Sequence, residues 1–217
     1  MNAAPISPKL LKGGVALLDA QTAAVLRIIP LQYNPDTLTR SLKIKSVDAQ
    51  SGDHIDALRL KGPPEESFKL EAEMDLTDQL EAGDSQAAQL GLHPALALLE
   101  LTVYPSSTHL LSTNALVSAG VLEIIPAQTP LTVFIFGPNR IMPVRITDLS
   151  VTEEAFDTSL NPIRAKVSLG MRVLSVDDLG FEQKGGSLFI TYLQQKELMR
   201  QLAASGSFKA LGIGGIP

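Results

Sequence analysis

The sequence contains no cysteine, and this absence excludes several kinds of chemistry. Without thiols there can be no disulfide, no thiolate metal site and no cysteine nucleophile. Aromatic residues make up only 5% of the chain, and no cluster of lysine and arginine is interleaved with them. Because the formal net charge is −5, the chain has no long-range attraction for nucleic acid. These features predict a protein that does not bind nucleic acid.

Long apolar runs are also missing. Residues Met1 to Lys12 include Pro5 and Pro8 and no apolar segment of signal-peptide length, which predicts that there is no Sec signal peptide. The two longest apolar passages, 94–104 and 115–137, are either too short to cross a bilayer or interrupted by charge and proline. We therefore expect a soluble protein without direct membrane insertion.

The sequence has little that points to catalysis or to a metal. His54, His93 and His109 do not have the spacing of metal ligands. The acidic residues in Glu71–Asp75 share a predicted strand face, where paired carboxylates for acid–base chemistry are the alternative to an ordinary solvated face. Ser106–Ser107 lacks the G-x-S-x-G pattern of a nucleophile elbow. We expect no enzymatic activity, no cofactor and no metal.

What the sequence does contain is a series of strand patterns, clearest from Leu131 to Leu174. Apolar and polar residues alternate without interruption from Arg164 to Val173, so one face of that strand is buried. The strand before it changes phase near Thr147 and Asp148, which predicts a β-bulge. The first run, 131–136, is apolar on both phases, so both of its faces must be covered. Together these runs predict three consecutive antiparallel strands.

The N-terminal half predicts four more strands. Gly14–Asp19 and Val25–Tyr33 form an expected hairpin, and Pro30 indicates that part of the second strand lies at an edge or bulge. A further strand is expected at 38–45, and strict alternation predicts another over Ser67–Leu76. Between these two, Ser46–Glu66 is polar and rich in glycine and proline, which is typical of a long functional connection. We expect it to contact a neighbouring subunit.

Two helices are expected, one in the middle of the chain and one near its end. Apolar residues recur at 92, 96 and 99 around Pro94, a pattern typical of a short amphipathic helix. Pro105–Asn114 is predicted as a loop, and Val117–Ile125 as a short strand. After a hinge at 185–186, Ser187 is the expected N-cap of a helix over Leu188–Ala203, followed by a loose tail at 205–217.

Several patches of the sequence together resemble the tube-domain family of contractile injection systems, the phage-tail-like particles that fire an inner tube through a contracting sheath. The matching stretches lie between Gly14 and Leu174: Leu31-Gln32-Tyr33-Asn34-Pro35, Leu60-Lys61-Gly62-Pro63-Pro64 before Phe68 to Thr77, Val133-Phe134-Ile135-Phe136-Gly137, Phe156-Asp157, and Asn161-Pro162-Ile163-Arg164-Ala165. Phe136 stands where family members usually have tryptophan, and Asn161 where they have glycine. The C-terminal LysM module that many members carry is missing after Leu174.

The resemblance implies a fold, an assembly and a set of partners. The fold is mainly β: two antiparallel sheets packed as a sandwich or open barrel, with a flanking short helix and a C-terminal helix. Residues 1–180 would form the tube-like domain, including the excursion at 46–66, and 181–217 a C-terminal helical extension and flexible tail. The implied function is structural, as a ring at the baseplate-proximal end of the inner tube that adapts tube and spike to the baseplate.

The implied partners are further copies of the chain, in a ring of six, together with the inner tube, spike or hub, and baseplate proteins of a particle assembled in the cytoplasm. Two faces of the chain are the expected subunit contacts, because the strand at 131–136 is apolar on both sides and the C-terminal helix has more than one apolar stripe. The candidate interface residues are Phe134, Phe136, Phe189, Leu193, Leu198 and Leu202. A β-barrel that binds a small ligand and a hydrolase on a β scaffold remain the alternatives.

Overall fold

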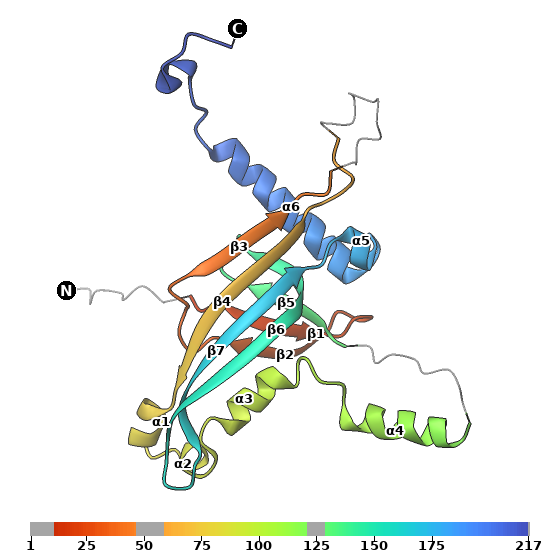
Figure 1. Ribbon diagram of the computed structural model, residues 1–217, viewed down its shortest axis with the longest axis vertical. Helices are drawn as coiled ribbons and strands as arrows, with labels where there is room; N and C mark the ends of the chain where they lie inside the picture. The colour runs from red at the N-terminus through yellow and green to blue at the C-terminus, as the bar shows by residue number, and fades with distance from the viewer. Residues whose placement is uncertain (1–10, 47–58, 121–128, 217) are drawn as a thin grey trace, which may run out of the picture.

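The computed structural model describes residues 11–46, 59–120 and 129–216 and is mainly β (Figure 1). Its seven strands form one antiparallel sheet that does not close on itself, in the order β2-β1-β5-β6-β7-β4-β3. The prediction of two packed sheets is not confirmed, because the strands are hydrogen-bonded into a single sheet. The strands are β1 (Gly14–Leu18), β2 (Val25–Pro30), β3 (Leu38–Lys43), β4 (Glu65–Asp75), β5 (Leu131–Ile135), β6 (Ile141–Phe156) and β7 (Pro162–Val173).

The helices lie in two places, between β4 and β5 and after β7. They are α1 (Thr77–Glu81), α2 (Ser85–Leu90), α3 (His93–Glu100), α4 (Ser107–Ser118), α5 (Val176–Leu179), α6 (Lys184–Leu202) and a 3-10 turn, η2 (Phe208–Leu211). The first four follow β4, and α5 and α6 follow β7. The predicted short helix around Pro94 is confirmed as α3, which buries Leu96 and Leu99.

The alternating patterns of the sequence correctly predict the centre of the sheet. The residues of β4 and β7 alternate between buried and accessible along most of their lengths, and the two strands pair from Ser67↔Arg172 to Asp75↔Arg164. The predicted bulge is confirmed, because the pairing of β6 with β7 shifts between Ile146 and Asp148. The N-terminal hairpin is also confirmed, and β2 with its Pro30 lies at the outer edge of the sheet.

The sheet is curved strongly enough for distant strands to meet over one core. The strands β6 and β7 separate β5 from β4, yet the ring centroids of Phe134 and Phe68 are 6.1 Å apart. The Gln32 side chain fixes this curvature, because it donates to the Asp75 carbonyl at 2.5 Å and accepts from the Asp75 amide at 2.9 Å. One curved sheet therefore builds the core for which the resemblance implied two packed sheets.

Two predictions about the chain between the strands need correction or lie outside the described residues. Residues 107–114 of the predicted loop Pro105–Asn114 belong to α4, as do Val117 and Ser118 of the predicted strand Val117–Ile125; residues 121–128 lie outside the described residues. The Ser106 hydroxyl accepts a hydrogen bond from the His109 amide and caps the helix. Most of the excursion Ser46–Glu66 lies outside the described residues, apart from its base, where Ser46 bridges Leu60.

Candidate functional site

Strands β6, β7, β4 and β3 form a four-stranded part of the sheet with one wholly polar face. Cross-strand pairing places every member of this face on the same side, since the side chains of paired residues point together. We call this surface the polar face. It consists of Arg145, Asp148, Ser150, Thr152 and Glu154 of β6, Arg164, Lys166, Ser168, Gly170 and Arg172 of β7, Glu65, Ser67, Lys69, Glu71, Glu73 and Asp75 of β4, and Thr39, Ser41 and Lys43 of β3. None of these residues is buried.

Charges of both signs neutralise one another across the polar face. Arg164 contacts the Asp75 carboxylate at 2.8 Å, and Lys166 contacts Glu154 at 3.1 Å. These four residues, with Tyr33 and Glu73, line a shallow hollow of about 270 Å³. The acidic residues considered for catalysis thus lie on an open face beside basic partners, which is the arrangement of a solvated sheet surface.

Asp75 is the most strongly perturbed acid of the polar face. Its pKa is lowered to about 2, first by hydrogen bonds from the Thr77 hydroxyl and the Thr77 amide and then by the adjacent Arg164 guanidinium. The ordinary value is 3.8, so the carboxylate stays ionised in the folded chain at mildly acidic pH. Asp75 therefore joins the end of β4 both to β7, through Arg164, and to Gln32.

We expect Asp75→Asn to flatten the acid side of the stability profile. The lowered pKa means that the ionised carboxylate stabilises the fold above pH 3.8, and that this contribution is lost as the pH falls toward about 2. The loss should be about 1–2 kcal/mol after solvent screening, and absent in the variant. Urea titrations between pH 2 and 6 measure it. Glu71→Gln on the same face is the control, and an equal flattening there would contradict this account.

Both outer edges of the four-stranded part are open among the residues that the structure describes. On one side, β3 pairs only with β4. On the other side, β5 pairs with β6 only from Ile141 to Val144, so from Arg145 onward β6 pairs only with β7. A strand with one unpaired edge presents free N–H and C=O groups to a further strand. The polar face is thus bounded on two sides by edges that can add a strand.

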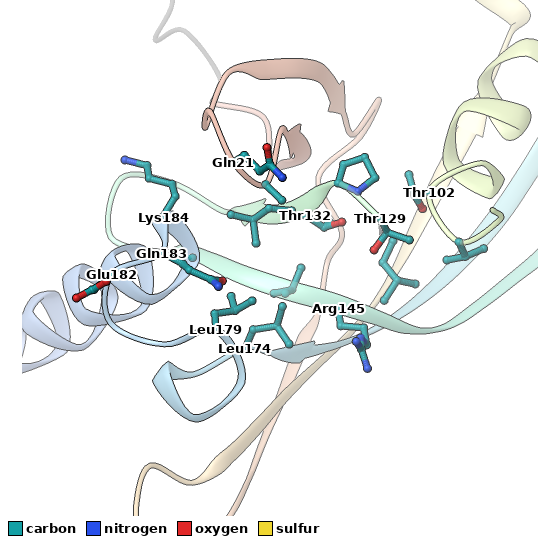
Figure 2. Close-up of a pocket in the computed structure, with 17 residues that line it drawn as sticks. Gln21, Thr102, Thr129, Thr132, Arg145, Leu174, Leu179, Glu182, Gln183 and Lys184 are labelled. Atoms are coloured by element: carbon teal, nitrogen blue, oxygen red, sulfur yellow. The ribbon is translucent and has the colours of Figure 1, made fainter. Parts of the chain in front are cut away.

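A groove of about 930 Å³ lies at the point where β5 leaves β6 (Figure 2). It runs between the β1–β2 turn, the residues after α3, the start of β5, and the α5–α6 junction. Lys184 and Glu182 extend away on one side, and the Arg145 guanidinium points away on the other (Figure 2). The charged side chains therefore do not converge on one point in the groove, as they would around a bound anion or a reacting group.

The remaining candidates from the sequence are dispersed. His93 begins α3 and His109 lies in α4, whereas His54 is outside the described residues. Ser106 is the N-cap of α4 and Ser107 is its first residue. In the part of the chain that the structure describes, no three His, Cys, Asp or Glu side chains are grouped as metal ligands. No helix in that part combines the length and apolar character needed to cross a bilayer.

The structure divides the predicted interface residues into two groups. Phe134 is 0% exposed, Phe189 is buried and Phe136 packs against the same core, so these three side chains contact the chain itself. The second face of β5 is also covered internally, because Leu131 and Val133 pack with Leu179 and Leu188. The prediction that a neighbouring subunit covers one apolar face of β5 is therefore wrong. Leu193, Leu198 and Leu202 are exposed on α6, and their role in an interface stays a prediction.

A buried glutamate, which the sequence reasoning did not identify, holds α6 on the sheet. Glu66 of β4 is only 4% exposed; it accepts from the Tyr192 hydroxyl at 2.8 Å and from Lys196 Nζ at 2.7 Å. Burial and the hydrogen bond to Glu66 raise the pKa of the Tyr192 hydroxyl, which stays a proton donor. We call these three residues the Glu66 anchor. The signal was present in the sequence, because Glu66 is a charged residue on the buried phase of β4, two residues before Phe68.

The pair Gly185–Gly186 is not a hinge but part of the first turn of α6, which begins at Lys184. Both glycines are buried. A Cβ on Gly186 would clash with the carbonyl oxygen of Gly180, and one on Gly185 would clash with Leu179. The glycines therefore allow α6 to approach the end of α5 closely, and they attach the helix to the sheet domain.

We expect Gly186→Ala to destabilise the chain by about 1–3 kcal/mol, because the added methyl group meets backbone that cannot move easily. A flexible, solvent-exposed hinge would give the opposite sign, since replacing an unstrained glycine by alanine gains about 0.4–1 kcal/mol by restricting the unfolded chain. Thermal denaturation distinguishes the two. Gly206→Ala is the matched control, because nothing lies within 4 Å of the added Cβ.

A scan against protein-family models gave no match, and neither did a search of the curated proteins. The motifs that carry the resemblance can still be followed in the structure. Asn34 accepts from the Gly13 amide and donates to the Leu11 carbonyl, next to the Gln32 contact with β4. Asp157 and Asn161 hold the β6–β7 turn through three hydrogen bonds, from the Ser159 and Asn161 amides and the Asn161 side chain. These motif residues therefore shape the sheet and its longest hairpin.

Proposed function

We propose that this chain is a structural ring subunit of a contractile, phage-tail-like injection particle. Copies of the chain join side by side through β3 and β6 and form a ring of the inner tube, at its baseplate-proximal end. The observation that carries this proposal is the presence of two open edges on opposite sides of one four-stranded sheet. The resemblance of the motifs to tube-domain proteins supports it.

The strand directions favour such a ring. Each strand of the unit is antiparallel to the next, and the unit contributes an even number of strands. When copies are related by rotation about an axis along the strands, β3 of one copy therefore runs antiparallel to β6 of the next. The sheet then continues without a change in its hydrogen-bond pattern. A contact between two different edges closes into a ring when the rotation closes.

The polar face supports a channel on the inside of the ring. Six copies, as the resemblance implies, would contribute four strands each and so 24 strands. Barrels with about 16 strands or more enclose an aqueous channel, so a wall of this size needs a water-facing surface. The polar face has no large apolar side chain and carries both signs of charge. The opposite, apolar face packs on the core and on α3 and α6.

The distal half of α6 supports a contact with the baseplate or the spike. Beyond the Glu66 anchor, Leu198, Met199 and Leu202 are exposed on the helix, and η2 adds Phe208 and Leu211. In Figure 1 this end of the chain extends past the ends of β3 and β4. We propose that it binds baseplate proteins. Assembly would take place in the cytoplasm, before any release of the particle.

Electron microscopy and native mass spectrometry of the purified full chain test the ring directly. We expect closed rings with a central channel and, in cells that produce such particles, co-purification of the chain with tube and baseplate proteins. A protein that is monomeric at high concentration and absent from purified particles would refute the proposal.

A further inference from the structure

The segment Leu101–Ser118, which we call the α4 arm, is an apolar extension of the domain. α4 has no buried residue, and in Figure 1 it extends away from the sheet at the lower right. From Thr102 to Gly120 the sequence contains no Asp, Glu, Lys or Arg. The exposed large apolar side chains of the arm are Leu101, Val103, Tyr104, Leu110, Leu111, Leu116 and Val117. A helix of 12 residues is marginally stable alone in water, so this arm needs a surface to pack on.

A second exposed apolar patch lies at the opposite edge of the sheet. It consists of Leu42, Ile44, Leu60 and Leu193, and we call it the β3 ledge. Leu42 is paired with Glu66, whose side chain lies beneath α6, so the ledge is on the apolar side of the sheet. The bridge from Ser46 to Leu60 brings Leu60 to this patch, and the Glu66 anchor holds the α6 turn that carries Leu193.

The arm and the ledge lie at matching heights on the two open edges. The chain residues Thr102 and Val103, which lead into α4, line the groove together with Arg145, where the open part of β6 begins. Arg145 is paired with Arg172, and Arg172 with Ser67. Ser67 in turn is paired with Ser41, the neighbour of Leu42. When β6 of one copy meets β3 of the next, the start of the arm therefore lies level with the ledge of that neighbour.

We propose that the α4 arm of each copy packs on the β3 ledge of the neighbouring copy. The partner is a second copy of this chain, and the contact is heterologous because two different patches meet. An uncharged helix on an apolar patch buries both surfaces without desolvating a charge. The contact lies on the outer side of the sheet and covers the seam between β6 and β3. This proposal rests on the proposed ring and names the segment through which one subunit contacts the next.

Crosslinking tests the contact, and the absence of native cysteine makes each introduced thiol unique. Two full-length variants, Leu111→Cys on the arm and Ile44→Cys on the ledge, are mixed and treated with a short bis-maleimide. Both positions are exposed, so the substitutions leave the core unchanged. We expect a covalent dimer in the mixture and much less in either variant alone. The dimer should be lost when Leu160→Cys, at the exposed β6–β7 turn, replaces Leu111→Cys.

A parallel mixture of Thr39→Cys and Ser150→Cys reports on the pairing of β3 with β6 itself. A dimer in both mixtures supports the arm contact within the ring. A dimer from the strand pair alone keeps the ring and overturns the arm contact. A dimer from the arm pair alone supports the contact and refutes the strand pairing. The absence of both dimers overturns both proposals, and a purely intramolecular crosslink in the doubly substituted Leu111→Cys, Ile44→Cys chain overturns the contact between copies.

Discussion

The substitution Phe134→Asp is expected to prevent the chain from folding. Phe134 is completely buried, and its ring packs against Phe68 and Phe136 with centroids 6.1 and 5.9 Å away. Removing a buried phenylalanine costs about 3–5 kcal/mol, and burying an unpaired carboxylate adds several more. Domains of this size are typically stable by about 5–15 kcal/mol, so the loss is comparable to the whole stability. Circular dichroism and urea denaturation of the purified variant measure it.

The control is Leu202→Asp, at a position that is 79% exposed near the end of α6. Its effect on the free energy of unfolding should stay within about 0.5 kcal/mol. A Phe134→Asp protein that unfolds cooperatively and with normal stability would mean that this side chain faces a neighbour and not the core. That result would restore the sequence-based interpretation of β5 as a subunit surface.

A pair of proline substitutions in the open half of β6 should separate folding from assembly. Adjacent residues of a strand direct their N–H groups to opposite edges, so only one of Thr152 and Glu153 donates toward β7. Proline at that position loses a ladder hydrogen bond and should cost about 1–3 kcal/mol. Proline at the other position leaves the β7 ladder intact but cannot donate to an incoming strand. The second variant should fold normally and form no rings.

Thermal denaturation identifies which of the two variants keeps its stability, and electron microscopy then scores rings for both. Thr158→Pro, in the exposed β6–β7 turn, controls for proline near this hairpin without touching the edge. If the stable variant assembles as well as the unsubstituted chain, the open half of β6 is not the surface that joins copies.

The sequence predicted the parts of the fold in which apolar residues recur at the spacing of a single secondary-structure element. In β4 and β7 the alternation is set by a single buried face, so it specifies each strand and its buried face. In β6 the change of phase specifies the bulge near Thr147. Alternation does not say how far a sheet bends. The side chain of Gln32 makes two hydrogen bonds to the backbone of Asp75. No sequence pattern around Gln32 predicts that contact.

Helix α4 was missed for a related reason. Its serines and threonines, including Ser112 and Ser118, have low helix propensity and read as a loop. In the helix, the Ser112 and Ser118 hydroxyls donate hydrogen bonds to the backbone carbonyls of His109 and Asn114. Their hydrogen-bonding needs are therefore met within the helix. Within the described part of the chain α4 has no buried residue, so no buried apolar stripe marks it as a helix.

The polar face could be predicted residue by residue, but its open edges could not. Alternation correctly placed Glu71, Glu73 and Asp75 on an accessible side of β4. Whether β6 has a neighbour beyond Val144 depends on where β5 begins and on the bend between them, which are tertiary features. Glu66 shows a different limit. A charged residue on the buried phase of β4 indicates that it has a partner, but the sequence does not identify that partner as Lys196.

The Glu66 anchor also determines how a mechanical load would enter this protein. A pull on the end of α6 reaches the sheet at Glu66, next to the first residue of β4. β4 is held on one side by β3 from Glu65 to Leu70 and on the other by β7 from Ser67 to Asp75. A force along the strand loads these hydrogen bonds together in shear, whereas a force across it would break them one after another. The C-terminal helix is thus attached to a strand that has a paired neighbour on each side, and not to an edge of the sheet.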